Sequence, residues 1–228
     1  MNFDQEKQTW KQGIQNEIEF WDSWIQNHGR EWPEDYIKRF DTNTEVDKLV
    51  ANCLAESTEP PTILDVGAGP LTVLGRTLPN KTPVIITAVD ALAEQYVALW
   101  DKANVIPPHR TLHCDAEKLD EKFDQSSFDL VHIRNALDHS YDPLLGIQKM
   151  LHVVKQNHYV ILIHNTNEAE AENYVGFHQW NFTTGAEGQF LIWNKSISIN
   201  VNEVLKEIGT VEVLTSDQQS IIVRICKK

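Results

Sequence analysis

The stretch Thr62–Pro70 (TILDVGAGP) constrains the fold of this chain more than any other. Apolar residues surround Asp65, which is typical of a buried parallel strand that ends just after it. Gly67 and Gly69 then predict a sharp turn, because glycine adopts positive φ without strain and lets a ligand approach the backbone. Pro70 favours the first turn of a helix, where its missing N–H would be unpaired in any case. The stretch therefore predicts a strand, a turn and a helix whose free amide donors face a ligand.

Composition excludes several classes of function. The 228 residues favour one domain, and 41% hydrophobic with 23% charged residues is ordinary for a globular chain. A net charge of −13 repels phosphate backbones and disfavours a nucleic-acid partner. No run approaches the ~20 apolar residues of a membrane span, and the first residues lack a signal-peptide pattern. Three scattered cysteines, Cys53, Cys114 and Cys226, indicate reduced thiols and a cytoplasmic location.

The hydrophobic pattern predicts an α/β protein. Residues 1–58 are expected to be helical, since apolar residues recur at spacings of three and four. From Thr62 on, apolar runs alternate with helical stretches, which indicates a parallel sheet with helices on both faces. We expect strands at 62–66, 84–89, 109–113, 128–133 and 158–164, and helices at 70–78, 91–103, 116–122 and 142–154. After a polar segment at 166–190, we expect a strand at 190–193, a helix near 200–208, and an antiparallel pair at 210–214 and 219–226.

The ends of the predicted strands carry groups that suit an adenosine. The dinucleotide fingerprint requires a third glycine three residues after Gly69, and its absence disfavours a nicotinamide oxidoreductase. The second strand ends in Asp90, whose carboxylate can accept both ribose hydroxyls. The third strand ends at Asp115, which can take the exocyclic amine of an adenine. The fourth strand runs into Asn135-Ala136-Leu137-Asp138-His139.

At these residues the chain resembles the class I S-adenosylmethionine-dependent methyltransferases, over about residues 60–165. The resemblance implies a Rossmann-like, seven-stranded, mostly parallel sheet with an antiparallel last strand, and S-adenosyl-L-methionine as cofactor. It also implies one methyltransferase domain over 1–228, with a helical cap (1–58), a cofactor-binding core (60–165), an acceptor-covering insertion (166–200) and a C-terminal helix and hairpin (201–228). The cofactor-binding residues that it implies are Asp65, Gly67, Ala68, Gly69, Pro70, Asp90, Ala91, Asp115, Ala116, Asn135 and Ala136.

The fourth motif narrows the range of acceptor classes. Methyltransferases that act on base amines or on glutamine usually carry Asn/Asp-Pro-Pro-aromatic there, whereas this chain has Asn-Ala-Leu-Asp. The segments 135–143 and 178–182 are instead similar to bacterial methyltransferases of carbohydrate and cell-surface glycan pathways. That similarity implies O-methylation of a small-molecule or oligosaccharide acceptor. A natural-product hydroxyl or amine, and a non-catalytic cofactor-binding partner subunit, remain alternatives, and a homodimer is left open.

A sugar hydroxyl needs a base near the transferred methyl group. His139 is the leading candidate, with Asp138 or Asp142 orienting its ring, although it can equally cap the following helix. His164 is the second candidate, against a structural role as a buried strand-end histidine.

The polar insertion supplies candidate acceptor-binding residues. His178, Trp180 and Asn181 suit a sugar, whose C–H face stacks on an aromatic ring while its hydroxyls form hydrogen bonds. Trp180 can equally fasten the loop to the core. Binding of a divalent cation stays open as a minor alternative, with Asp138, His139, Asp142, His164 and Glu168 as its candidate ligands. Their spacing matches no established ligand pattern, so no metal site is predicted.

Overall fold

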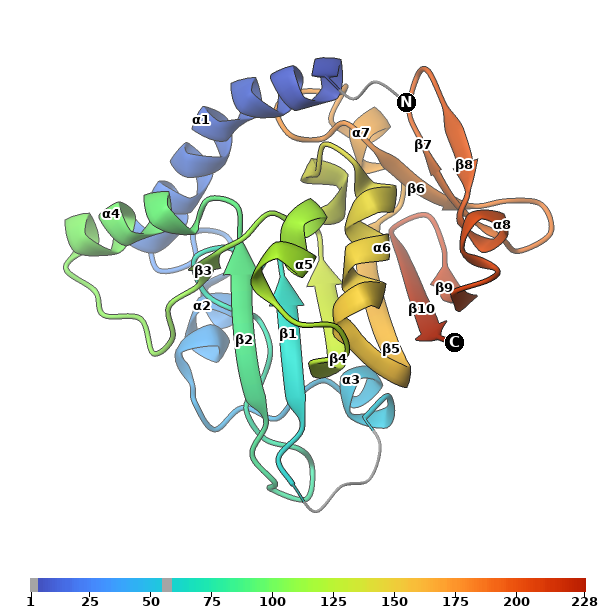
Figure 1. The fold of residues 1–228 in the computed structure, drawn as a ribbon. Coiled ribbons are helices and arrows are strands. Elements are labelled where there is room, and N and C mark those ends of the chain that lie inside the picture. Colours follow the sequence, from blue (N-terminus) through green and yellow to red (C-terminus); the bar gives the residue numbers. More distant parts are fainter. Residues whose placement is uncertain (1–3, 55–58) are drawn as a thin grey trace.

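The computed structural model describes residues 4–54 and 59–228. In these residues, seven strands form one sheet in the order β3-β2-β1-β4-β5-β10-β9 (Figure 1). The first five strands in the chain are parallel to one another, and β10 is antiparallel to both of its neighbours, β5 and β9. The architecture confirms the predicted Rossmann-like fold with its antiparallel last strand. The strands are β1 (Thr62–Val66), β2 (Ile85–Asp90), β3 (Leu112–His113), β4 (Phe128–Arg134), β5 (Val154–Asn165), β9 (Gly209–Ser216) and β10 (Ser220–Lys227).

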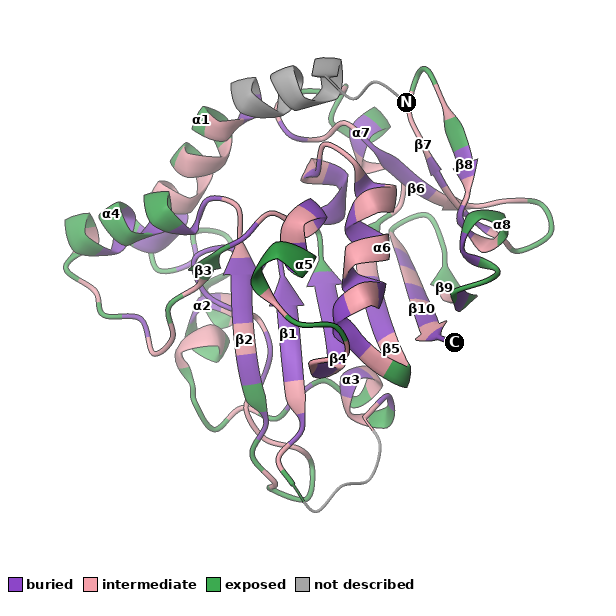
Figure 2. Ribbon diagram, viewed as in Figure 1, coloured by how far each residue is buried: buried purple, intermediate pink, exposed green. Residues whose placement is uncertain are grey.

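Helices surround this sheet, and the most buried strands lie at its centre (Figure 2). The helix α1 lies across the edge of the sheet where β1, β2 and β4 end (Figure 1). The helices are α1 (Asp4–Gln26), α2 (Pro33–Phe40), α3 (Lys48–Asn52), α4 (Ala93–Ala103), α5 (Leu119–Lys122), α6 (Pro143–Val153), α7 (Glu168–Ala171) and α8 (Val201–Leu205), with 3₁₀ turns η1 (Ala116–Lys118) and η2 (Leu137–His139). No helix of the described ranges is both long enough and apolar enough to cross a membrane.

A second, three-stranded antiparallel sheet follows β5. It consists of β6 (Asn181–Thr184), β7 (Phe190–Trp193) and β8 (Ser198–Asn200). Its inward side chains Trp180, Phe182, Phe190 and Ile192 are buried in the same cluster as the strands β4, β5 and β10. The three-stranded sheet therefore shares one hydrophobic core with the main sheet.

The segment 70–78 is not the predicted helix. It runs as irregular chain beside the α2–α3 connection, where Arg76 N donates to Thr44 O and Val46 N donates to Thr77 O. A Cβ on Gly75 would lie 2.2 Å from the backbone of Glu45. Bonds to a distant segment therefore replace the i→i−4 bonds that a helix would require.

Other predicted elements form with shifted ends. The helices at 91–103 and 142–154 are found as α4 and α6, and the segment 116–122 divides into η1 and α5. The segment predicted as merely polar contains α7 and β6, and β8 was not predicted. The predicted helical layer at 1–58 holds three helices, and its residues 1–3 and 55–58 lie outside the described residues.

Candidate functional site

A cavity of about 720 Å³ lies at the carboxyl ends of β1, β2 and β4, and residues of α1 and α2 also line it. This is the edge at which open α/β sheets bind ligands. Asp65, Asp90 and Asp115 all line it, so the predicted strand-end acids share one crevice. Its volume falls in the range of small-molecule and cofactor sites.

The turn after β1 has the predicted backbone. Gly67 and Gly69 have φ values of 63° and 64°. A Cβ on Gly67 would lie 2.4 Å from the Cβ of Ala136, and one on Gly69 would lie 2.7 Å from Cζ2 of Trp21. Only glycine fits at both positions, because the conformation and the space each exclude a side chain.

The amides of this turn are not all free donors, in contrast to the expectation. Ala68 N donates to Val89 O at 3.0 Å, and Gly69 N donates to Oδ2 of Asp90 at 2.9 Å. The turn is thus fastened to the end of β2, which fixes the wall of the cavity.

The carboxylate of Asp65 is held by two side chains of the protein itself. Its Oδ1 lies 2.7 Å from Nδ1 of His132 on β4, and its Oδ2 accepts from Oγ1 of Thr72 at 2.5 Å. All three residues are buried. Since buried polar groups without partners are costly, this network holds the end of β1 against both β4 and the segment after the turn.

The next two acids are also held by neighbours. Oδ1 of Asp90 accepts from Leu92 N at 2.8 Å and from the hydroxyl of Tyr96 at 3.3 Å. Burial raises the pKa of Asp90 to about 6, against the lowering effect of these hydrogen bonds. Asp115 forms an ion pair with Lys118 at 2.6 Å.

Aromatic side chains from α1, and Trp32 directly before α2, form one wall of the cavity. Phe20, Trp21, Trp24 and Trp32 line it, and Trp21 packs edge-on against Trp24 with ring centroids 5.4 Å apart. Arg39 lines the same wall, donates to Leu71 O at 2.6 Å and pairs with Asp35 at 2.7 Å.

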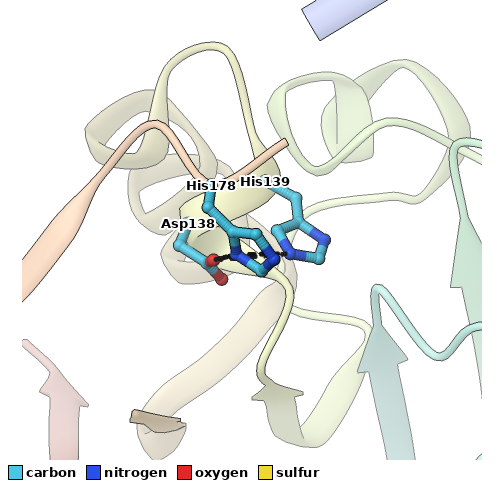
Figure 3. A group of neighbouring side chains, drawn as sticks. All are labelled: Asp138, His139 and His178. Atoms are coloured by element: carbon cyan, nitrogen blue, oxygen red, sulfur yellow. Dashed lines mark hydrogen bonds and ion pairs between the residues drawn. The ribbon is translucent and has the colours of Figure 1, made fainter. Parts of the chain in front are cut away.

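Asp138, His139 and His178 form one polar cluster in the cavity (Figure 3). Nδ1 of His178 lies 2.8 Å from Oδ2 of Asp138 and 3.3 Å from Nε2 of His139. The same Oδ2 lies 3.4 Å from Nε2 of His139. The turn η2 after β4 supplies the first two residues, and the segment before β6 supplies the third.

The cluster is electrostatically coupled. Burial would raise the pKa of Asp138, but the fields of His139 and His164 and the hydrogen bond from His178 lower it below its ordinary value. Burial lowers the pKa of His178, yet the neighbouring Asp138 carboxylate raises it overall. The cluster therefore favours one negative charge facing imidazole nitrogens.

Some predicted site residues lie elsewhere. Four of them are absent from the described residues that line the cavity: Pro70, His164, Trp180 and Asn181. His164 is buried beside Phe182, and burial lowers its pKa to about 4. Trp180 is fully buried and donates through Nε1 to Ser140 O at 3.1 Å, which fits its alternative role of fastening the loop. Asn181 accepts from Glu170 N and donates to the Tyr174 hydroxyl.

The remaining predicted residues line the cavity: Gly67, Ala68, Gly69, Ala91, Ala116, Asn135 and Ala136, together with the acids and the cluster. Sequence reasoning missed Glu17, Tyr96, Glu117 and Phe177, which also line it. Glu117 directly follows the third strand end and Phe177 precedes His178, so proximity to predicted site residues was an available signal. Glu17 and Tyr96 sit on helices with no local motif, so no such signal exists for them.

Comparisons with known proteins concern the family model and the fold. Residues 64–162 match a family model described as a methyltransferase domain. No curated protein matches the chain. The citrinin polyketide synthase CMeT domain is 16% identical, with a TM-score of 0.51 over 77% of this chain and 48% of that one. The CurJ carbon methyltransferase is 16% identical, with a TM-score of 0.50 over 76% and 50%. A SAM-dependent methyltransferase from Aquifex aeolicus is 16% identical, with a TM-score of 0.49 over 84% and 92%.

Proposed function

We propose that this chain is an S-adenosylmethionine-dependent methyltransferase and that it methylates a hydroxyl oxygen of a small, carbohydrate-like acceptor. The match of residues 64–162 to a family model described as a methyltransferase domain supports the methyl-transfer chemistry. The proposal assigns residues 60–165 to holding the cofactor, 166–200 to covering the acceptor, 1–58 to capping the cleft, and 201–228 to completing the single domain.

The residues of the cavity fit the cofactor. The Gly67–Gly69 turn lines the cavity with backbone, and the Asp90 carboxylate lies at the end of the neighbouring strand. Asp115 lies at the end of the third, where an adenine amine would be bound. When bound, S-adenosylmethionine supplies an activated methyl group together with its own leaving group.

The observation that carries the choice of an oxygen acceptor is the Asp138–His139–His178 cluster in the same cavity. An alcohol must lose its proton as its oxygen attacks, whereas the sulfur leaves without needing an acid. Asp138 and the two imidazoles present the lone pairs and the negative charge that this proton loss requires. The acceptor O–H bond breaks, the O–CH₃ bond forms, and the electrons of the S–CH₃ bond remain on sulfur.

The walls around the cluster suit a polar acceptor. Arg134, Glu168 and Glu172 line the cavity and supply charged hydrogen-bonding groups. Phe177 lies beside His139, with ring centroids 5.6 Å apart, and provides an apolar face. Polar groups around an aromatic surface are the combination that a sugar ring favours. Phe177 thus takes the place that sequence reasoning gave to Trp180.

Replacing His139 tests the proposal. We expect His139→Ala to lower kcat by about 10²–10⁴-fold, since it removes a group that acts at the reacting hydroxyl. Binding of S-adenosylmethionine, measured by calorimetry, should change little. His158→Ala is the matched control, because this partly exposed histidine also lies near a carboxylate, Asp129, at 3.7 Å, but outside the cavity.

An acceptor panel with methyl-labelled cofactor identifies the substrate class. Transfer to sugar hydroxyls supports the proposal, whereas transfer only to amines, or full turnover in His139→Ala, contradicts it. Cofactor binding without transfer to any acceptor on a broad panel would indicate the non-catalytic alternative.

A further inference from the structure

We infer that Asp138, His139 and His178 bind a divalent transition-metal cation that holds and activates the acceptor hydroxyl. The inference rests on the proposed function for the cation's role in the reaction, but not for the existence of the binding site.

The three donor atoms lie at the separations that a metal would impose. Nδ1 of His178 lies 2.8 Å from Oδ2 of Asp138 and 3.3 Å from Nε2 of His139. The third distance, from Nε2 of His139 to Oδ2 of Asp138, is 3.4 Å. Ligands about 2.1 Å from one metal ion are about 3.0 Å apart in octahedral and about 3.4 Å apart in tetrahedral geometry. Figure 3 shows the three side chains converging from two segments of the chain.

Hydrogen bonds join the three atoms less completely than a cation would. Each neutral imidazole carries one N–H, and a carboxylate carries none. Nδ1 of His178 can donate to Oδ2 of Asp138 at 2.8 Å, and Nε2 of His139 can donate to the same oxygen from 3.4 Å. The two nitrogens then face each other from 3.3 Å without a hydrogen bond between them, whereas a cation engages all three atoms.

The surroundings favour a cation and leave room for a substrate. Asp138 is buried, whereas His139 and His178 are partly exposed toward the cavity. Glu168 and Glu172 line the same cavity and add negative potential. Because three protein ligands leave coordination positions open, an acceptor hydroxyl can complete the sphere.

The donor set selects the kind of metal. Two imidazole nitrogens and one carboxylate suit Zn²⁺, Co²⁺, Mn²⁺ or Fe²⁺, while Mg²⁺ and Ca²⁺ prefer oxygen ligands. No change of oxidation state is involved. The cation lowers the pKa of the bound hydroxyl, the proton passes to water, and the resulting alkoxide forms the new O–CH₃ bond. His139 then acts as a ligand, which replaces the free base expected from the sequence.

Co²⁺ alone is the probe for the site. We expect the full-length, tag-free, chelator-stripped protein to bind one Co²⁺ per chain, with a visible ligand-field band that Zn²⁺ abolishes. His139→Gln and His178→Gln should each weaken Co²⁺ binding at least about 100-fold, and His158→Gln should leave it unchanged. Circular dichroism of each variant verifies its fold. No saturable binding to the wild-type protein at 1 mM Co²⁺, or unchanged affinity in both folded histidine variants, overturns the inference.

Activity separates this inference from the proposed function. Methyl transfer to a hydroxyl that is lost on chelation and restored by Co²⁺ or Zn²⁺ supports both. Transfer that continues at full rate in the stripped protein overturns the metal and leaves the hydroxyl acceptor in place. One bound Co²⁺ that depends on His139 and His178, with no transfer to any hydroxyl, supports the site and contradicts the acceptor.

Discussion

Two carboxyl groups that line the cavity have pKa values raised by burial. The pKa of Asp90 is raised to about 6, and that of Glu117, which accepts a hydrogen bond from Asp142 N at 3.0 Å, is raised to about 7. Both groups therefore change charge near neutral pH, and the two have different consequences. We expect Asp90 to affect cofactor binding and Glu117 to affect the stability of the fold.

Cofactor affinity should fall at low pH because of Asp90. Only the ionised carboxylate can accept hydrogen bonds from both ribose hydroxyls, and its pKa in the unliganded protein is about 6. We expect the Kd for S-adenosylmethionine, measured by calorimetry from pH 5 to 8, to rise by up to about tenfold per unit below pH 6. Asp90→Asn should bind weakly and lose this dependence. A Kd in the wild-type protein that does not change over this range contradicts the assignment.

Glu117 should make the protein less stable as pH rises. Its pKa is raised from 4.5 to about 7 on folding, so its contribution favours folding below pH 4.5 and is lost as pH rises through 7. Glu117→Gln keeps the acceptor oxygen for Asp142 N without the charge. We expect urea unfolding at pH 8 to show a gain of about 2–3 kcal/mol, with little difference at pH 4. An equal effect at both values would show that packing, and not ionisation, is responsible.

The helix α1 supplies part of the wall of the cavity. Its Trp21 contacts the Gly69 turn, donates through Nε1 to Glu17 at 2.7 Å and packs edge-on against Tyr96 with ring centroids 6.3 Å apart. The helix thereby touches both the turn after β1 and a residue that binds Asp90. Apolar contact of this kind shields charged groups below it from water.

Removing that contact should loosen the cofactor. We expect Trp21→Ala to raise the Kd for S-adenosylmethionine by about tenfold, equivalent to about 1.4 kcal/mol, while the fold is retained. Trp193→Ala on β7 is the matched control, because it removes a tryptophan that does not line the cavity. An equal Kd for S-adenosylmethionine in the two variants would show that Trp21 of α1 does not contribute to cofactor binding.

At the scale of the whole molecule, local patterns predicted the sheet and the strand-end acids. Thr62–Val66 and Asp90 were recognisable because apolar runs that end in an acid have few other structural explanations. The irregular course of 70–78 was not, since it depends on bonds to residues near Glu45 that no local pattern records. The same holds for the meeting of Asp138 with His178, which are 40 positions apart.

Two hydrogen bonds join the insertion to η2 and to the residue directly after it. Gln179 N donates to Asp138 O at 3.3 Å, and Trp180 donates to Ser140 O. Under the proposed function, one half of the reactive centre comes from the segment that follows β4, and the other half from the insertion. We therefore expect that changes within residues 166–200 alter the acceptor without weakening donor binding, as long as both hydrogen bonds are preserved.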